Sequence, residues 1–95
     1  MTETIDDLTI EYEEDGTVLV KQLDKYVLTK GAWSTIMYKY QDLDKKTNEY
    51  GPSKFRVVRY RKQNGYFSAQ SKFNISSVDQ AKKIVEQLSK WVEEG

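Results

Sequence analysis

The chain has 95 residues and no net charge, because 15 lysines and arginines balance 15 aspartates and glutamates. It contains neither cysteine nor histidine, which excludes disulfides, thiolate chemistry and the commonest general base and metal ligand. This length can bury one core, so residues 1–95 are expected to form a single domain.

The sequence shows no sign of export or of membrane insertion. Its first residues are acidic and carry no apolar run, so no signal peptide is predicted. No apolar stretch approaches the roughly 20 residues that span a bilayer. A cytoplasmic protein without membrane contact is expected, and the absence of cysteine is compatible with a reducing compartment.

Charge is unevenly distributed along the chain. Residues 1–16 contain seven acids and no base, whereas residues 17–75 contain twelve bases and four acids, a net charge of +8. A basic middle of this kind indicates nucleic acid or an acidic partner. The alternative is that the acidic start pairs with the basic middle inside the fold.

The N-terminal half predicts three strands. Residues 8–13 alternate apolar and polar, Asp15-Gly16 is a hairpin signal, and residues 17–22 read as the returning strand, extended again over 26–29. Residues 32–43 are rich in aromatic and β-branched side chains, which favours a third strand. Its alternation places Ser34, Ile36, Tyr38 and Tyr40 on one face and Trp33, Met37 and Leu43 on the other.

A basic hairpin follows the polar loop of residues 44–53. Residues 54–62 read Lys-Phe-Arg-Val-Val-Arg-Tyr-Arg-Lys, a strand in which cations alternate with aromatic and branched residues. Asn64-Gly65 is the strongest short-range hairpin signal. Residues 66–73 are its expected partner strand, with Phe67, Ala69, Ser71 and Phe73 on one face.

The C-terminal segment predicts an amphipathic helix. Ser77 followed by Gln80 is a capping-box pattern. Apolar residues then repeat at three- and four-residue spacing: Val78, Ala81, Ile84, Val85, Leu88, Trp91 and Val92. The predicted fold class is α+β, an antiparallel meander of four to five strands followed by one C-terminal amphipathic helix packed on one sheet face, with the other face open.

No catalytic equipment is visible, so the chain is not expected to be an enzyme or to hold a cofactor or metal. The five scattered glycines form no phosphate-binding loop. Ser71 and Lys72, the available nucleophile and base, are adjacent and point to opposite faces of a strand. Asp42 and Asp44 share a strand face at a loop edge, where a solvated pair is expected.

Binding is better supported than catalysis. Lysine and arginine neutralise backbone phosphates, and exposed rings stack on unpaired bases. Phe55 and Val57 resemble core residues, which would leave Arg56, Tyr60 and Lys62 on the open face. The predicted phosphate contacts are Arg56, Arg59, Arg61, Lys62 and Lys72, and the predicted stacking rings are Tyr38, Tyr60 and Tyr66. The alternative for each tyrosine is a cross-strand pair or half-buried core. For Trp33, both a stacking platform and a core anchor are open.

A family resemblance rests on three motifs. The strand reads Val57-Val58-Arg59-Tyr60, the turn Gln63-Asn64-Gly65, and the start of the helix Lys72-Phe73-Asn74-Ile75-Ser76-Ser77. From Phe55 to Leu88 the chain resembles the positive-cofactor-four type of transcriptional coactivator, the single-stranded-DNA-binding domains related in fold to the plant Whirly proteins. The family's Lys-Gly pair is Lys72-Phe73 here, and residues 2–28 have no counterpart.

The resemblance implies a four-stranded sheet plus helix, a homodimer built through the C-terminal helices, and single-stranded DNA lying across the sheets. Arg59 and Lys72 would be the carried-over contacts. The predicted function is non-catalytic binding of single-stranded nucleic acid, with a role in transcription implied by the resemblance. The alternative is a protein–protein interaction module that uses the open sheet face or an edge strand, favoured by the zero net charge and the acidic start.

Overall fold

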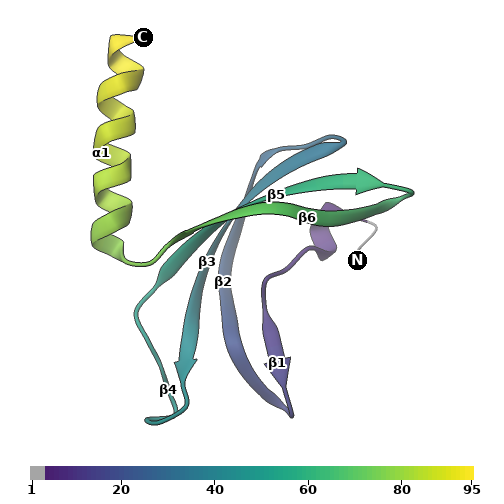
Figure 1. Cartoon of the computed structure of the whole chain (residues 1–95). Helices are drawn as coiled ribbons and strands as arrows, with labels where there is room; N and C mark the ends of the chain where they lie inside the picture. The colour runs from purple at the N-terminus through teal and green to yellow at the C-terminus, as the bar shows by residue number, and fades with distance from the viewer. Residues whose placement is uncertain (1–3) are drawn as a thin grey trace.

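The computed structural model describes residues 4–95, and it confirms an α+β fold in which an antiparallel sheet precedes one C-terminal helix (Figure 1). A turn of 3-10 helix comes first, and the strands and α1 follow: η1 (Ile5–Asp7), β1 (Tyr12–Glu14), β2 (Thr17–Thr29), β3 (Trp33–Asp44), β4 (Glu49–Tyr50), β5 (Lys54–Gln63), β6 (Tyr66–Ile75) and α1 (Val78–Glu94). The sheet order is β1-β2-β3-β5-β6, and β4 pairs with β3. Sequential neighbours therefore pair, as a meander requires.

The short strand β4 is an addition to the predicted meander. It pairs with the end of β3 through Leu43 and Tyr50, and β5 resumes the pairing with β3 where Tyr40 meets Lys54. Gly51-Pro52-Ser53 separates β4 from β5, and proline has no N–H to donate to a ladder. One returning strand is thus divided into two pieces along the same edge of β3.

Both predicted tight turns are confirmed by their backbone conformation. Asp15 and Gly16 have φ of 51° and 80°, and Asn64 and Gly65 have φ of 53° and 83°. Two successive residues with positive φ match the right-handed twist of the flanking strands, which is why Asp-Gly and Asn-Gly pairs are favoured there.

The core lies on one face of the sheet, which we call the inner face. Eight of the nine buried residues among residues 4–95 lie there, from β3, β5, β6 and the N-terminal segment: Leu8, Ser34, Ile36, Tyr38, Tyr40, Val58, Tyr60 and Phe67. The ninth, Ile75, pairs with Phe55 on the other face. The even-numbered residues of β3 predicted to share a face are thus the core residues. The odd-numbered residues of β3 and β5 point to the opposite, outer face.

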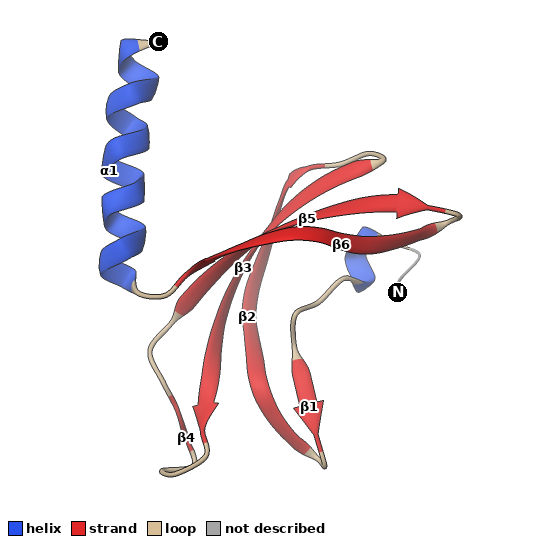
Figure 2. Ribbon diagram, in the orientation of Figure 1, coloured by secondary structure: helices blue, strands red, loops and turns tan. Residues whose placement is uncertain are grey.

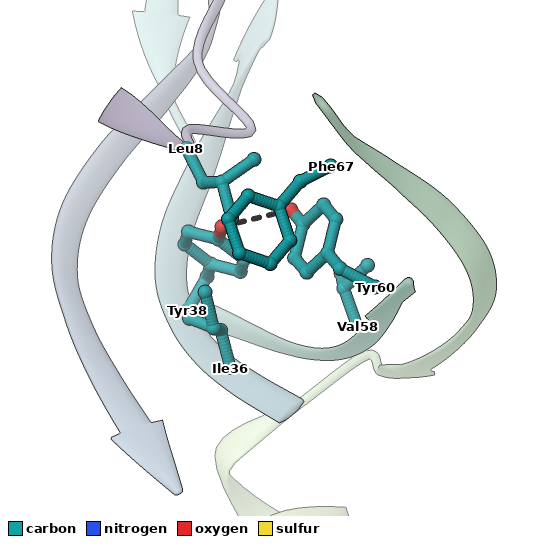
Figure 3. Close-up of a cluster of buried hydrophobic side chains, with 6 residues drawn as sticks. All are labelled: Leu8, Ile36, Tyr38, Val58, Tyr60 and Phe67. Atoms are coloured by element: carbon teal, nitrogen blue, oxygen red, sulfur yellow. Dashed lines mark hydrogen bonds between the residues drawn. The ribbon is translucent and has the colours of Figure 1, made fainter. Parts of the chain in front are cut away.

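Two tyrosines occupy the centre of this core. Tyr38 is 1% exposed and Tyr60 is 6% exposed, and their hydroxyl oxygens are 2.8 Å apart in a shared hydrogen bond (Figure 3). Leu8 and Phe67 pack with the two rings. A buried hydroxyl without a partner is costly, and this single hydrogen bond, in which one hydroxyl donates and the other accepts, gives each of them a partner.

The N-terminal segment covers the inner face and is held by hydrogen bonds. The Lys25 Nζ donates to the carbonyl oxygens of Ile5 at 2.6 Å and Leu8 at 2.8 Å, and the Gln22 Oε1 accepts from the Thr9 hydroxyl at 2.7 Å. Within residues 4–95 the sole ion pair joins Lys54 to Asp42. The acidic start is therefore anchored through its backbone, and ion pairing with the basic middle is not what holds it.

Helix α1 does not pack on a sheet face, so this part of the prediction is wrong. The helix leaves the end of β6 and extends away from the strands (Figure 2), and it contains no buried residue. Its predicted cap is present, because Ser77 Oγ accepts from the Gln80 N–H at 3.1 Å and Gln80 Oε1 accepts from the Ser76 N–H at 2.8 Å. This reciprocal pair fixes the direction of the first turn. The apolar stripe is exposed as a result.

A bulge also corrects the predicted faces of β6. Arg59 pairs with Ser71 and Tyr60 pairs with Ala69, so Gln70 is an extra residue in β6. One extra residue moves every following side chain to the opposite face. Phe67 and Ala69 therefore belong to the inner face, while Ser71 and Phe73 belong to the outer face.

The tyrosine pair gives a first prediction. Tyr38→Phe leaves the Tyr60 hydroxyl buried without its partner, so the free energy of unfolding should fall by about 1–3 kcal/mol. The double variant Tyr38→Phe/Tyr60→Phe buries no orphan hydroxyl and should lose less than the sum of the two single losses. Urea unfolding of the four proteins measures this coupling. Strictly additive losses would show that the two hydroxyls act independently.

A second prediction concerns alkaline pH. Burial raises the pKa of both Tyr38 and Tyr60 above the usual value, and the hydrogen bond to Tyr60 raises the pKa of Tyr38 further. Above about pH 10, unfolded tyrosines release protons that the folded ones retain. The free energy of unfolding should therefore fall as pH rises beyond about 10. Urea unfolding at several pH values tests this, and the double phenylalanine variant should show a shallower fall.

Candidate nucleic-acid interface

The structure removes two of the three predicted stacking rings from the surface. Tyr38 and Tyr60 are core residues, so the prediction that they are open to a base is wrong. The prediction failed because it assigned the wrong face of β5 to the core. Val58 and Tyr60 face the core, whereas Phe55 and Val57, which resembled core residues, lie on the half-exposed outer face.

Three of the predicted cations lie on the inner side, around the margin of the core. The Arg56 Nε donates to the Asn74 Oδ1 at 2.6 Å, and its guanidinium lies 4.8 Å from the Tyr40 ring centre. Lys62 lies 5.4 Å from the Phe67 ring centre and lines the same surface hollow as Asp6. Lys72 is exposed and pairs with Val58.

Arg59 and Arg61 meet Trp33 on the outer face, and Tyr66 lies on the same face at the start of β6, opposite Gln63. We call these four residues the basic end. The guanidinium carbons of Arg59 and Arg61 lie 4.4 Å and 5.3 Å from the Trp33 ring centre. Trp33 is 41% exposed and Tyr66 is 43% exposed. Strand pairing produces this cluster, since Trp33 is opposite Arg61 and Thr35 is opposite Arg59 across β3 and β5.

The arginines of the basic end have no carboxylate partner in the part of the chain that the structure describes. The acidic strand β1 is at the far edge of the sheet, separated from β5 by β2 and β3. Three strand spacings of about 4.8 Å place it roughly 14 Å away. The neutral chain therefore has a local surface whose two positive charges are free to meet an anion.

A second outer-face cluster runs across four strands. Tyr26, Met37, Val57 and Phe73 are aligned by the pairing of β2, β3, β5 and β6, and we call them the apolar row. Tyr26 is 67% exposed and Phe73 is 54% exposed. Trp33 lies four positions from Met37 along β3, about 13 Å, whereas Arg59 lies only two positions from Val57 along β5, about 7 Å.

Trp33 is the member of the basic end that sequence reasoning left open. Its place follows from the alternation of β3, because Trp33 is out of phase with the core residues Ser34, Ile36 and Tyr38. That phase marks an outer-face residue once the core face is known. Its pairing with Arg61 depends on the register between β3 and β5, which the sequence does not specify.

Asp42 and Asp44, the two carboxylates that share a strand face, each accept a hydrogen bond from a nearby lysine. The Lys54 Nζ donates to the Asp42 Oδ2 at 2.8 Å, and this hydrogen bond raises the pKa of Lys54. Asp44 Oδ1 accepts from the Lys46 N–H at 2.9 Å. Residues 4–95 contain no cluster of three or more potential metal ligands. In the same residues, no helix is long and apolar enough to cross a membrane.

The chain matches no known protein family, no curated protein and no solved structure. Its resemblance to the positive-cofactor-four coactivators stays a prediction. The two carried-over contacts, Arg59 and Lys72, lie on opposite faces of the sheet. The function of the chain is therefore inferred from the chemistry of its own surface.

The exposure of Trp33 gives a third prediction. Trp33→Ala should lower the free energy of unfolding by about 1 kcal/mol, because much of the ring is already in water. Ile36→Ala, which removes a fully buried side chain from the same strand, should cost about 2–5 kcal/mol. Chemical denaturation of both variants makes the comparison. Equal losses would place Trp33 in the core.

Proposed function

We propose that the protein binds single-stranded nucleic acid without catalysis, and that the basic end of the outer face is the contact surface. The observation that carries the proposal is the stacking of two unpaired arginines, Arg59 and Arg61, on the half-exposed ring of Trp33. This places phosphate-binding groups and a stacking ring within one cluster. A cytoplasmic location is part of the proposal.

The chemistry favours a single strand over a duplex. Unpaired bases stack on aromatic rings and on guanidinium planes, and each base contributes about 1–3 kcal/mol. Trp33 and Tyr66 offer rings, and Arg59 and Arg61 offer both planes and charges. These contacts involve ring faces and phosphates, which all nucleotides have, so only a weak preference for base sequence is expected. Arg56, Lys62 and Lys72, on the inner side of the sheet, are left out of this contact surface.

A second candidate function is a protein–protein interaction module. The apolar row favours it, because exposed aligned apolar side chains mark contacts with other proteins. The two candidates differ in their response to salt. A phosphate contact loses affinity steeply between about 50 and 200 mM salt, whereas an apolar contact changes little.

The fourth prediction tests the proposal by fluorescence anisotropy with a labelled oligothymidine. Arg59→Ala/Arg61→Ala removes two phosphate contacts, so affinity should fall at least tenfold at low salt. The slope of log K against log salt should become shallower by roughly 1.4 for a single strand. Trp33→Ala should lower affinity about 5- to 150-fold, the equivalent of one lost stacking contact, and leave that slope unchanged.

The matched control is Lys45→Ala/Lys46→Ala. It removes the same charge from the exposed turn between β3 and β4, about 36 Å along β3 from Trp33. This variant should bind as the parent protein does. Equal weakening by the two double variants would reduce the interaction to non-specific charge attraction. If the parent protein fails to bind at low salt, the proposal is rejected.

A further inference from the structure

Helix α1 exposes an apolar stripe that its own chain does not cover. Val85, Leu88, Trp91 and Val92 are all more than half exposed, and no residue of the helix is buried. Most helical stability in proteins comes from packing of the apolar side, and isolated helices near this length are marginal in water. The 17 residues of α1 therefore need a surface to pack on.

The radius of gyration and the accessible surface also indicate that the single chain leaves a surface to be covered. Its radius of gyration is 15.3 Å, whereas a compact chain of this length has about 12 Å. Its accessible surface is 7057 Å², whereas a folded monomer of 11.1 kDa exposes about 5,700 Å². The excess of roughly 1,400 Å² exceeds the roughly 800 Å² that each partner buries in a standard interface.

The apolar row is a surface of matching chemistry on the same chain. It crosses four strands, about 14 Å between the outer strand axes, and α1 is about 25 Å long. Beside the row, Tyr26, Met37 and Phe55 line a hollow of about 140 Å³ whose lining also includes the charged residues Asp24, Lys25 and Lys39. A hollow of this kind accepts one large apolar side chain, the usual anchor of an interface.

We propose that the protein is a dimer in which each copy lays helix α1 across the apolar row of the other. The occupant of the row is thus the helix of a second copy of this chain. Exchange of identical elements is reciprocal, so two copies close the assembly with a two-fold axis and leave neither stripe exposed. The capping box between Ser76, Ser77 and Gln80 directs each helix away from its own strands.

This dimer does not depend on the proposed nucleic-acid function. Trp33 and Arg61 lie about 13 Å from the apolar row along β3 and β5, so a helix on the row leaves them open and borders only Arg59, about 7 Å away. A negative binding experiment with oligothymidine therefore leaves the dimer standing. If the protein proved to be monomeric, the proposal that the basic end binds nucleic acid would likewise be unaffected.

The first test is the oligomeric state by light scattering and analytical ultracentrifugation. Leu88→Asp and Phe73→Asp each place a charge in one half of the proposed contact, and each should raise the dimer dissociation constant at least 100-fold. Both side chains are exposed in the single chain, so the sheet should stay folded by circular dichroism. Lys83→Asp, on the opposite side of the helix, should stay dimeric. A monomeric parent protein overturns the proposal.

The second test identifies what the helix contacts. The chain has no cysteine, so Ser89→Cys accepts one nitroxide label beside the stripe. This protein is mixed with ¹⁵N-labelled parent protein, and amide signals of the parent are recorded. Broadening at Tyr26, Met37, Val57 and Phe73 is expected. Broadening confined to residues 78–94 would show helix-to-helix association, and no broadening would show no dimer; either result overturns the proposal.

Discussion

The shared hydrogen bond between Tyr38 and Tyr60 determines which face of the sheet is the core. Two large rings can be buried side by side because one hydroxyl donates to the other at 2.8 Å, which leaves neither hydroxyl without a partner. Once they are inside, the period-two geometry of β3 and β5 sends Trp33, Arg59 and Arg61 to the other face. The candidate site therefore follows from a buried polar pair on the opposite side of the sheet. The N-terminal segment completes this arrangement, because it supplies Leu8 as the cover that the helix does not provide.

Local patterns predicted the elements of the fold well. The Asp-Gly and Asn-Gly turns, the capping box at Ser77 and the α+β order depend on neighbours in sequence, and all are present. The buried face of β5 could not be predicted from its sequence. Arg56, Val58 and Tyr60 alternate with Phe55, Val57 and Arg59, and neither set is purely apolar. The bulge at Gln70 has no signal in the sequence, yet it changes the face of Phe73. The pairing of strands that are distant in sequence determines both the buried face of β5 and the face on which Phe73 lies.

The position of the helix shows a different limit of sequence reasoning. An amphipathic stripe indicates that a helix packs on something, but the pattern does not identify the surface. The prediction placed the stripe on the sheet of its own chain, where a single folded unit would need it. The structure gives the inner face to the N-terminal segment and leaves exposed both the stripe and the two ends of the apolar row, Tyr26 and Phe73. The stripe that was expected to pack on its own sheet, and that the family resemblance places in a homodimer built through the helices, is therefore available to pack on the sheet of a second copy.

The outer face combines two chemistries that make different demands on solvent. Burying the apolar row away from water is favourable. Removing water from the arginines of the basic end is costly unless an anion takes its place. Trp33 and Arg61 lie about 13 Å from the apolar row along β3 and β5, which lets both conditions hold at once. A chain without net charge can present a positive surface because seven of its fifteen acids lie in residues 1–16, whose described part contains η1 on the inner side and β1 at the far edge of the sheet. In a two-fold dimer built on the apolar rows, each copy would contribute one basic end. A strand long enough to reach both ends would then bind with the second contact made at high effective concentration.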